Sequence, residues 1–511
     1  MLLVGLALMT AVWSVTTPPG TAADEVDHYI KALAIGRGEV RGDAPRVDPT
    51  DSLTAILRQR EPTADNVSQL RAVRWIAAGA RTFELPTGLV PTKLGCFNNL
   101  FMRANTAVPA KCEIELGPEP GERRYISYEA VNPPYMYVFS GAAMRLAGDH
   151  NSVRAYRLGR AAMGFVCLAL IALAFMLLWD RSAGTLSLLG AMVAVTPTSV
   201  WSFSVLNPSG LEIAGATLYA AALLRLLRGP GPPRWLWAAA AAGGVALATA
   251  RSSGPLFIVL IPLCIGLLFG FDRLLVATRR LGGKAITVAA CLAVALVAAA
   301  FWLRYIPNYP LGFGVLDYLD DAISGLPRTL RETVGRFAGD YFIPIWVLLG
   351  WAAMLIALLI AAGRVAMRPL RRRLALVTGV ALVFTTAYAT VYLNNGFLEF
   401  YGRYAIPGLV VLPLSAGWIL VERREQLTAA ARTRLVTGLA TGTGLIQLLA
   451  WWLESRRIAV GTDGPFFFMS DSAWDPPGGW LPWVVLMLLA TAVYVAAPAY
   501  AGTVNDARDA G

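Results

Sequence analysis

Long apolar stretches alternate with shorter polar ones along the chain. A run of about 20 apolar residues lets a helix cross the hydrocarbon core of a bilayer. The residues from Met1 to Val15 fall short of that length, and we expect them to form an uncleaved first helix. Later spans are expected at 158–179, 185–206, 210–227, 235–250, 254–271, 285–303, 343–363, 374–393, 404–421, 435–453 and 480–500. The pattern predicts an all-α integral membrane protein with about 12 transmembrane helices.

One polar stretch is far longer than an ordinary connection. It runs from residue 18 to residue 154, and a loop of this length is typical of a folded, functional segment. Inside it, residues 133–146 are apolar but too few for a confident span, so a juxtamembrane helix on the outer leaflet is favoured over a crossing. The predicted organisation is a first transmembrane helix at 1–17, a large extracytoplasmic loop at 18–154, a polytopic domain at 155–504 and a cytoplasmic tail at 505–511.

Composition agrees with a membrane protein. The chain is 56% hydrophobic and 15% charged, and its mean hydropathy is +0.55. The net charge of +11 does not indicate nucleic-acid binding, because the basic residues fall mainly in loops between apolar segments. Arginine-rich loops such as 364–373 are expected inside, which puts both termini in the cytoplasm and the long loop outside a bacterial plasma (inner) membrane.

Five cysteines add one structural expectation. Cys167, Cys264 and Cys291 lie within apolar runs and are expected to behave as small hydrophobic residues. Cys96 and Cys112 share the long polar loop. They form either a disulfide, which an oxidising extracytoplasmic compartment favours, or two unrelated free thiols.

Candidate chemistry begins directly after the first helix. The segment from Asp24 to His28 reads DEVDH and contains one of only two histidines in the chain. If a helix starts after the Pro18-Pro19-Gly20 turn, Asp24 and His28 share one face, with Glu25 beside them. The alternative is a helix N-cap with a solvated first turn, where Asp and Glu are favoured in any case.

Several short motifs, taken in order, resemble those of a known group of enzymes. The arrangement is similar to that of integral-membrane GT-C glycosyltransferases, and more closely to a bacterial family of predicted membrane proteins, of unassigned function, distantly related to them. The motifs are DEVDH at 24–28, glycines at 36 and 38, NPPYMY at 132–137, NPSG at 207–210, ARSSGP at 250–255 and GRYAIP at 402–407. This resemblance implies a GT-C-like fold. It also implies an enzyme that takes its sugar from a polyprenyl-phosphate carrier.

The resemblance also implies roles for the acidic segment. An acidic residue at the start of the first outer loop serves GT-C enzymes as general base or metal-site carboxylate, and Asp24 matches that position. Glu25 is then a neighbour or second ligand. His28 orients Asp24, contacts phosphate, binds a divalent metal, or is simply a surface residue of the helix.

Basic residues near the outer membrane surface hold the lipid phosphate in that group. Arg251 and Arg403 are the candidates, because both flank Pro-containing turns on the expected outer face and a guanidinium binds phosphate through paired hydrogen bonds. Alternatively, Arg251 snorkels to the interface and Arg403 pairs with Glu399. Glu129 and Asn132 stand where related enzymes place substrate-facing groups. Several of those enzymes carry a lysine there, and this chain does not.

The leading functional hypothesis is a membrane glycosyltransferase. It would move a sugar from a polyprenyl-phosphate carrier to an extracytoplasmic glycan, lipid or protein of the cell envelope, in contact with membrane lipids and without nucleic acid. Two alternatives stay open. One is a transporter or flippase of a lipid-linked glycan, and the other is a non-catalytic envelope assembly protein that keeps the GT-C-like fold.

Overall fold

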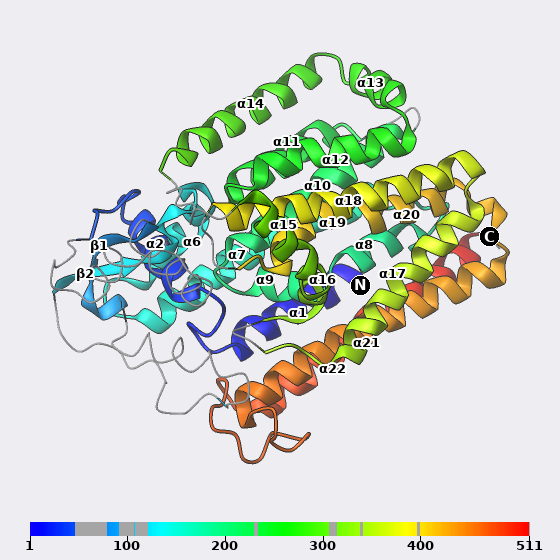
Figure 1. The fold of residues 1–511 in the computed structure, drawn as a ribbon. Helices are drawn as coiled ribbons and strands as arrows, with labels where there is room; N and C mark the ends of the chain where they lie inside the picture. Colours follow the sequence, from blue (N-terminus) through cyan, green and yellow to red (C-terminus); the bar gives the residue numbers. More distant parts are fainter. Residues whose placement is uncertain are drawn as a thin grey trace.

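A bundle of long apolar helices makes up most of the protein, and a smaller lobe lies at one end of it (Figure 1). The structure is a computed structural model. It describes residues 1–45, 79–90, 107, 121–228, 233–305, 314–337, 341–395 and 399–509.

Eight described helical segments are long and apolar enough to cross a membrane. They are α7 (Ser152–Leu178), α10 (Pro208–Leu227), α14 (Gly283–Leu303), α17 (Ile345–Val365), α18 (Arg368–Asn394), the segment Gly402–Glu422 formed by α19 (Gly402–Leu409) and α20 (Val411–Glu422), α21 (Ala429–Val460) and the part Trp480–Ala497 of α22 (Trp480–Asp509). The predicted class, a helical integral membrane protein, is therefore confirmed.

Two bent helix pairs raise the number of candidate spans to 10. The first joins η6 (Thr185–Leu188) and α8 (Leu189–Ala194) to α9 (Pro197–Ser204) with a bend of 73°. The second joins α12 (Gly254–Phe269) to α13 (Phe271–Arg279) with a bend of 112°. Two further apolar helices, α1 (Leu2–Thr16) and α11 (Leu236–Ala250), are shorter. Helices occupy all the predicted spans, while the count of about 12 crossings stays a prediction.

Local sequence explains where these helices break. Pro197 takes the first position of α9, where its missing N–H costs nothing, and the Thr196 hydroxyl accepts a hydrogen bond from the Ser199 N–H. Gly270, between α12 and α13, has φ +104°, a conformation that side-chain-bearing residues rarely adopt. The bends therefore follow from a proline start and a glycine hinge.

The centre of the bundle is formed by α10 and the α19–α20 segment, which are almost wholly buried. Helix α10 packs against α7 and α11, and α11 in turn packs against α14. Figure 1 shows α14 at the edge of the bundle, and most of its surface is exposed. An exposed apolar face of this kind is what a lipid-facing helix requires.

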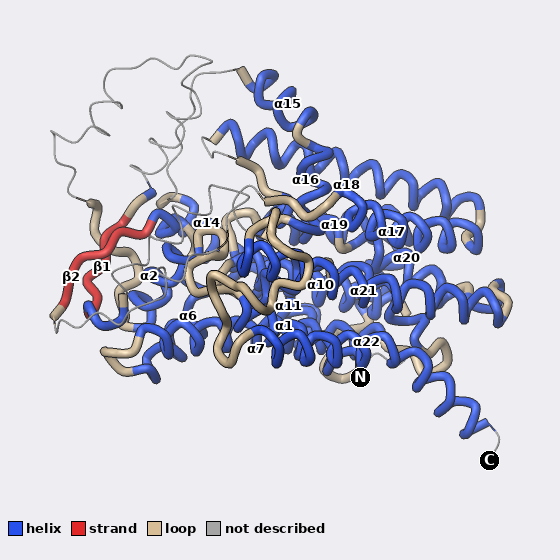
Figure 2. The backbone as a smooth tube through the Cα atoms, turned by 90° about the horizontal axis from the view of Figure 1, so that it is seen from below, coloured by secondary structure: helices blue, strands red, loops and turns tan. Residues whose placement is uncertain are grey.

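The lobe is built from α2 (Glu25–Gly36), β1 (Arg81–Pro86), β2 (Glu122–Ser127) and α6 (Tyr137–Met144). The two strands pair antiparallel, with Arg81 opposite Ser127 and Pro86 opposite Glu122. Figure 2 shows this ribbon at the far end of the molecule from the C-terminus. The all-α expectation missed this ribbon, because its two strands lie in a long polar segment and pair with each other across many intervening residues.

The lobe is held together by a close helix crossing. A side-chain carbon added at Gly36 of α2 would lie 2.3 Å from the Gly141 carbonyl oxygen of α6, and one at Gly141 would lie 2.5 Å from the Ala32 oxygen. Only glycine lets two backbones approach this closely.

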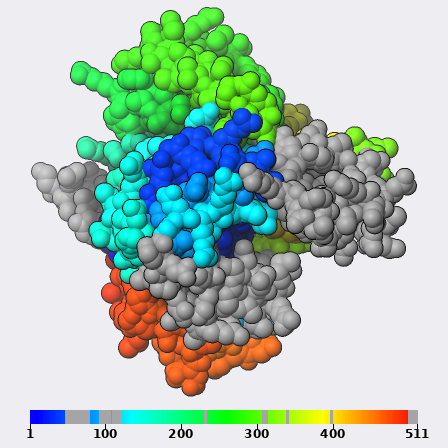
Figure 3. All heavy atoms as spheres, turned by 90° about the vertical axis from the view of Figure 1, so that its left-hand side faces the viewer, coloured from blue at the N-terminus to red at the C-terminus, as the bar shows by residue number. Residues whose placement is uncertain are grey.

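In the end-on view, the N-terminal segment and residues 121–150 lie together, with the α14 side above and the 461–479 loop below (Figure 3).

The apolar segment 133–146 forms only short helices. These are η4 (Pro134–Met136), α6 and η5 (Arg145–Ala147), and the eight residues of α6 reach about 12 Å, too little to cross a bilayer. Val138 and Phe139 are half exposed, as an interfacial helix requires. Cys96 and Cys112 lie outside the described residues, so their pairing stays a prediction.

Candidate functional site

Asp24 lies at the junction of the bundle and the lobe. It occupies the N-cap position of α2 with φ 61°, and it is the one non-glycine residue of the described chain in the left-handed region. Its side chain makes no capping hydrogen bond. Instead, Asp24 Oδ2 accepts a hydrogen bond from Arg403 Nη2 at 3.0 Å. Asp24 therefore stands at the N-cap position, as the capping alternative expects, but its carboxylate binds Arg403 and does not cap the helix.

The two partners of this ion pair differ in exposure. The Asp24 side chain is 42% exposed, whereas that of Arg403 is 4% exposed. A buried guanidinium and an accessible carboxylate give a site that a polar ligand can reach from the Asp24 side. Backbone strain at such a residue is typical of functional sites.

Glu25 is placed differently from the catalytic or ligand role expected beside Asp24. Its carboxylate is buried and accepts hydrogen bonds from Arg160 Nε at 2.7 Å and Nη2 at 2.5 Å. The N–H groups of Gly20 and Leu206 also donate to it, at 3.0 and 3.1 Å. With four donors, Glu25 has no free lone pair to offer a metal or a substrate, and it fixes the turn before Asp24 to α7.

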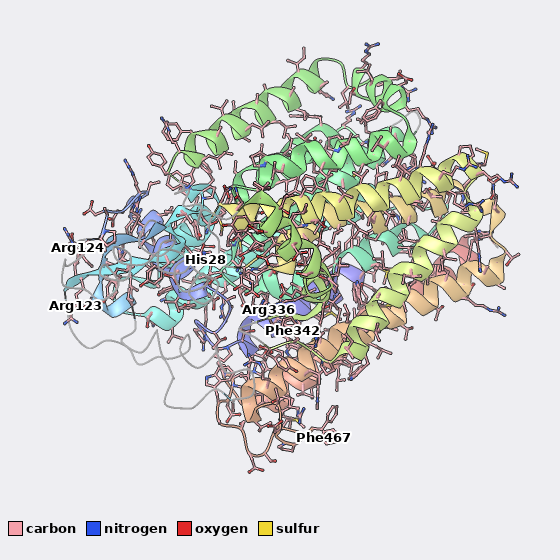
Figure 4. All side chains as sticks on the ribbon, viewed as in Figure 1. His28, Arg123, Arg124, Arg336, Phe342 and Phe467 are labelled. Carbon is pink, nitrogen blue, oxygen red and sulfur yellow. The ribbon has the colours of Figure 1, made fainter. Side chains whose placement is uncertain are left out.

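His28 is buried one helical turn after Asp24. Its Nδ1 lies 2.7 Å from the Tyr137 hydroxyl of α6. Burial, reinforced by the positive charges of Arg251 and Arg403, lowers the pKa of His28 well below its usual value. The imidazole is therefore neutral at pH 7. Figure 4 places His28 inside the lobe, where the lobe meets the bundle, so the surface-residue alternative is wrong.

Lys31 is a part of this region that the sequence analysis missed. It lies on the same face of α2 as Asp24 and His28, and it is completely buried. Its Nζ donates to the carbonyl oxygens of Ala130, at 2.6 Å, and Asn132, and it lies 5.1 Å from the ring centre of Trp302. The spacing 24, 28, 31 was the available signal, because it continues one helical face by another turn.

Glu129 and Asn132 are held next to α2 by these contacts. Asn132 Nδ2 donates to the Glu129 carboxyl group, and Trp302 Nε1 donates to the Val131 carbonyl at 2.7 Å. Glu129 is partly buried. This burial, together with the negative charge of Asp24, raises the pKa of Glu129 to about 8. The group is therefore mainly protonated at neutral pH.

Arg251 and Arg403 meet at one aromatic ring. Their guanidinium carbons lie 4.0 and 5.0 Å from the ring centre of Tyr404. Arg251 follows the last residue of α11, and its Nη1 lies 3.4 Å from the Ser209 hydroxyl of α10, so the ARSSGP and NPSG motifs are neighbours in space. Arg251 Nε also lies 4.0 Å from Glu212 Oε2. Both arginines are buried, which excludes a snorkelling role for Arg251.

Glu399 belongs to a different set of contacts. It binds Arg336, the residue that follows α16 (Leu326–Gly335), with Nη1 to Oε1 at 2.9 Å and Nη2 to Oε2 at 3.2 Å, and it also pairs with Arg328 of that helix. The alternative pairing of Glu399 with Arg403 is therefore wrong. Arg336 and the neighbouring Phe342 are labelled in Figure 4.

A buried carboxylate of α16 supports the start of α19. Glu332 accepts a hydrogen bond from the Gly402 N–H at 2.7 Å, and a side-chain carbon at Gly402 would lie 2.4 Å from the Thr329 oxygen. Helix α16 thus fixes the residue that precedes Arg403. Glu399 is connected to this support by Arg336, whose Nη1 donates to Glu332 at 2.7 Å and to Glu399 at 2.9 Å.

Five residues predicted from the sequence therefore form one group, which we call the Asp24 cluster: Asp24, His28, Glu129, Arg251 and Arg403. They come from α2, the 128–132 turn, the α11–α12 turn and α19. Within the described part of the chain, no group of three His, Cys, Asp or Glu side chains is arranged to hold a metal ion.

Comparison with known proteins identifies the family. A model of the family described as predicted membrane protein (DUF2142) matches residues 6–412. The chain belongs to this family. The DUF2142 match includes the whole Asp24 cluster and ends before α21 and α22.

Among solved structures, this DUF2142 protein is similar to ArnT from Cupriavidus metallidurans in the apo state. The two are 17% identical, the match covers 72% of this chain and 65% of the ArnT chain, and the TM-score is 0.34. The match thus spans less than two thirds of the ArnT chain. No curated protein matches the sequence.

Proposed function

We propose that this protein is a GT-C-type glycosyltransferase that moves a sugar from a polyprenyl-phosphate carrier to an extracytoplasmic acceptor of the cell envelope. The observation that carries the proposal is the contact between the accessible Asp24 carboxylate and the buried Arg403 guanidinium. It brings a candidate base and a candidate phosphate-binding group within 3.0 Å of each other. A transfer from a phosphate to a hydroxyl needs both.

The phosphate would be bound by the two arginines. Arg403 and Arg251 are both adjacent to Tyr404 and both buried, and a buried guanidinium attracts an anion more strongly than one in water. His28 is neutral and Glu129 is mainly protonated, so neither cancels the arginine charges within the Asp24 cluster. Asp24 occupies a position on Arg403 that a phosphate oxygen could take over.

The proposed step is a single displacement. The acceptor hydroxyl oxygen attacks the anomeric carbon while the bond from that carbon to the phosphate oxygen breaks. The electron pair of the broken bond leaves with the polyprenyl phosphate, and the hydroxyl proton passes to Asp24. This displacement inverts the anomeric configuration. Protonated Glu129 would donate a hydrogen bond to the sugar or the phosphate.

We also propose an orientation for the protein in the membrane. The protein would lie in the bacterial plasma membrane with both termini in the cytoplasm, and the Asp24 cluster would face outside. The acceptor would be a glycan, lipid or protein of the envelope.

The test is sugar transfer in reconstituted membranes from a labelled polyprenyl-phosphate sugar to envelope acceptors. Asp24→Asn keeps the shape but removes the proton acceptor, and the rate should fall by about 10²–10⁴-fold while carrier binding survives. Arg403→Ala should weaken carrier binding, and Arg403→Lys should restore only part of it, because lysine lacks the paired donors.

The matched control is Asp149→Asn. Asp149 forms an exposed ion pair with Arg37, away from the Asp24 cluster, and its loss should leave transfer unchanged. Unmodified transfer by a folded Asp24→Asn variant would reject the proposal. Movement of the intact carrier across the membrane without transfer would instead support the transporter alternative.

A further inference from the structure

A cavity lies between α1 and α7, and Arg160, which binds Glu25, is part of its wall. Its volume is about 680 Å³. Its walls come from α1, α7, the end of α9 and the loop between α21 and α22, and we call it the α1–α7 groove. Figure 1 shows that loop, residues 461–479, at the end of the bundle that carries the lobe.

The two helices that form the groove run antiparallel. Near the lobe, Arg160 Nη1 of α7 donates to the carbonyl oxygens of Thr17 and Ser14, at 2.6 and 2.8 Å. Farther along, a side-chain carbon at Gly164 would lie 3.8 Å from a methyl carbon of Thr10 on α1. The groove therefore follows both helices from their lobe ends toward the middle of the bundle.

Polarity changes along the groove. At the lobe end, its walls include Arg157, Tyr156 and Asp475. Toward the middle of the bundle, they are apolar or small, with Ala7, Ala11, Ala161, Gly164, Phe165 and Leu168. The small residues leave the space, and exposed Phe165 borders it. A cavity that is polar at one end and apolar along its length matches a lipid.

Two residues of the groove wall carry buried hydroxyl groups that lack partners. Tyr156 Oη and Thr17 Oγ1 make no hydrogen bond within the described chain, although both residues are almost inaccessible. Buried polar atoms are nearly always hydrogen-bonded, so an unpaired pair on a cavity wall indicates a ligand with polar atoms at that point. Tyr156 itself is fixed by stacking on Tyr29, with ring centres 3.9 Å apart.

The two charged side chains at the mouth of the groove, Arg157 and Asp475, do not form an ion pair with each other. Arg157 is exposed and makes no ion pair with any residue that the structure describes. Asp475 is also exposed, and it receives a hydrogen bond from the Ser472 hydroxyl. The mouth thus offers one cation and one anion that do not neutralise each other.

We propose that the α1–α7 groove binds a zwitterionic phospholipid with an ammonium head group, of the phosphatidylethanolamine type. Arg157 and the Tyr156 and Thr17 hydroxyls contact the phosphate, Asp475 contacts the ammonium group, and an acyl chain follows Ala161 and Leu168 into the bundle. This binding does not depend on the proposed sugar transfer. Arg160 lies on the groove wall and holds Glu25, so a bound lipid would also brace the turn that carries Asp24.

The test is native mass spectrometry of the purified full chain titrated with phosphatidylethanolamine or phosphatidylglycerol. Phosphatidylglycerol keeps the phosphate but lacks the ammonium group. The unmodified protein should prefer phosphatidylethanolamine. Arg157→Gln should weaken binding of both lipids by at least about tenfold, as expected for the loss of a charge-assisted contact. Asp475→Asn should remove the preference for phosphatidylethanolamine over phosphatidylglycerol, because it removes the carboxylate that contacts the ammonium group.

Two pairs of variants separate the groove from the lipid shell. Arg154→Gln removes an exposed arginine of the same helix that is not on the groove wall, and it should have no effect. Ala161→Phe should fill the groove and abolish retained lipid, whereas Ala169→Phe, exposed on α7 outside the groove, should not.

Three outcomes would overturn the proposal. Equal effects of Arg157→Gln and Arg154→Gln would show a general lipid shell, and retained lipid in folded Ala161→Phe would show that the groove is not the site. Equal affinity of the unmodified protein for the two lipids would reject the assigned head group. If Ala161→Phe fails to fold, the arginine pair alone decides.

Discussion

At Glu129, the folded protein holds a proton more tightly than the unfolded chain does. Its pKa is raised from 4.5 to about 8, so between these values the unfolded chain loses the proton and the folded protein keeps it. The free energy of unfolding should therefore fall as pH rises from about 4.5 to 8, and this loss should stop above about 8. Glu129→Gln should flatten that slope in thermal unfolding scans.

A residual slope should survive in Glu129→Gln, because burial raises the pKa of Asp27 to about 7. Glu122→Gln, on the exposed strand β2, should leave the slope unchanged. If Glu129→Gln and the unmodified protein show parallel curves from pH 5 to 8, Glu129 is ionised in the folded state and cannot donate the proposed hydrogen bond.

Glu25 and Arg160 form a buried ion pair whose loss should be structural. Removing one partner leaves an uncompensated buried charge, and Glu25→Gln should lower the free energy of unfolding by about 3–5 kcal/mol. Arg37→Gln breaks an exposed pair and should cost no more than about 1 kcal/mol. Chemical denaturation measures both. Similar costs for the two variants would contradict the assignment of Glu25 to the support of the Asp24 turn.

At the scale of the elements, the α2–α6 crossing positions Asp24, His28 and Lys31. Gly36→Ala places a carbon 2.3 Å from a backbone oxygen of α6, which cannot move like a side chain. We expect a loss of about 1–3 kcal/mol and a displaced α2. Gly379→Ala in α18, where an added carbon meets nothing within 4 Å, is the matched control and should be neutral or stabilising. An equally stable Gly36→Ala variant would show that the two helices do not cross this closely.

For the whole molecule, the distribution of arginines predicts orientation in the membrane. In a background lacking the five native cysteines, Arg124→Cys on β2 should react with an impermeant thiol reagent from outside, and Arg372→Cys at the start of α18 should not. Arg124 lies at the outer edge of the lobe in Figure 4. Labelling of position 372 from outside would invert the topology and remove the Asp24 cluster from the extracytoplasmic side.

The sequence by itself determined the class of protein and the positions of its helices. Apolar run length fixes where a chain can satisfy its backbone in lipid, so the helices coincide with the apolar runs. It also singled out Asp24 and His28, by their place directly after the first apolar run, while Glu129, Arg251 and Arg403 were indicated by short motifs that resemble those of GT-C enzymes. It missed the β1–β2 ribbon, because the two strands that pair lie far apart along the chain, and it missed Lys31 although the spacing 24, 28, 31 continues one helical face.

Only the tertiary structure decided which of these residues face the Asp24 cluster and which ones support the surrounding helices. Asp24 and Glu25 are adjacent carboxylates with similar local signals, yet one faces Arg403 at 42% exposure and the other is buried against Arg160. Arg403 could equally have paired with the nearby Glu399, which instead binds Arg336. These pairings depend on how α7, α16 and α19 lie relative to the start of α2. Contacts between residues hundreds of positions apart produce no repeating pattern in the sequence from which they could be predicted.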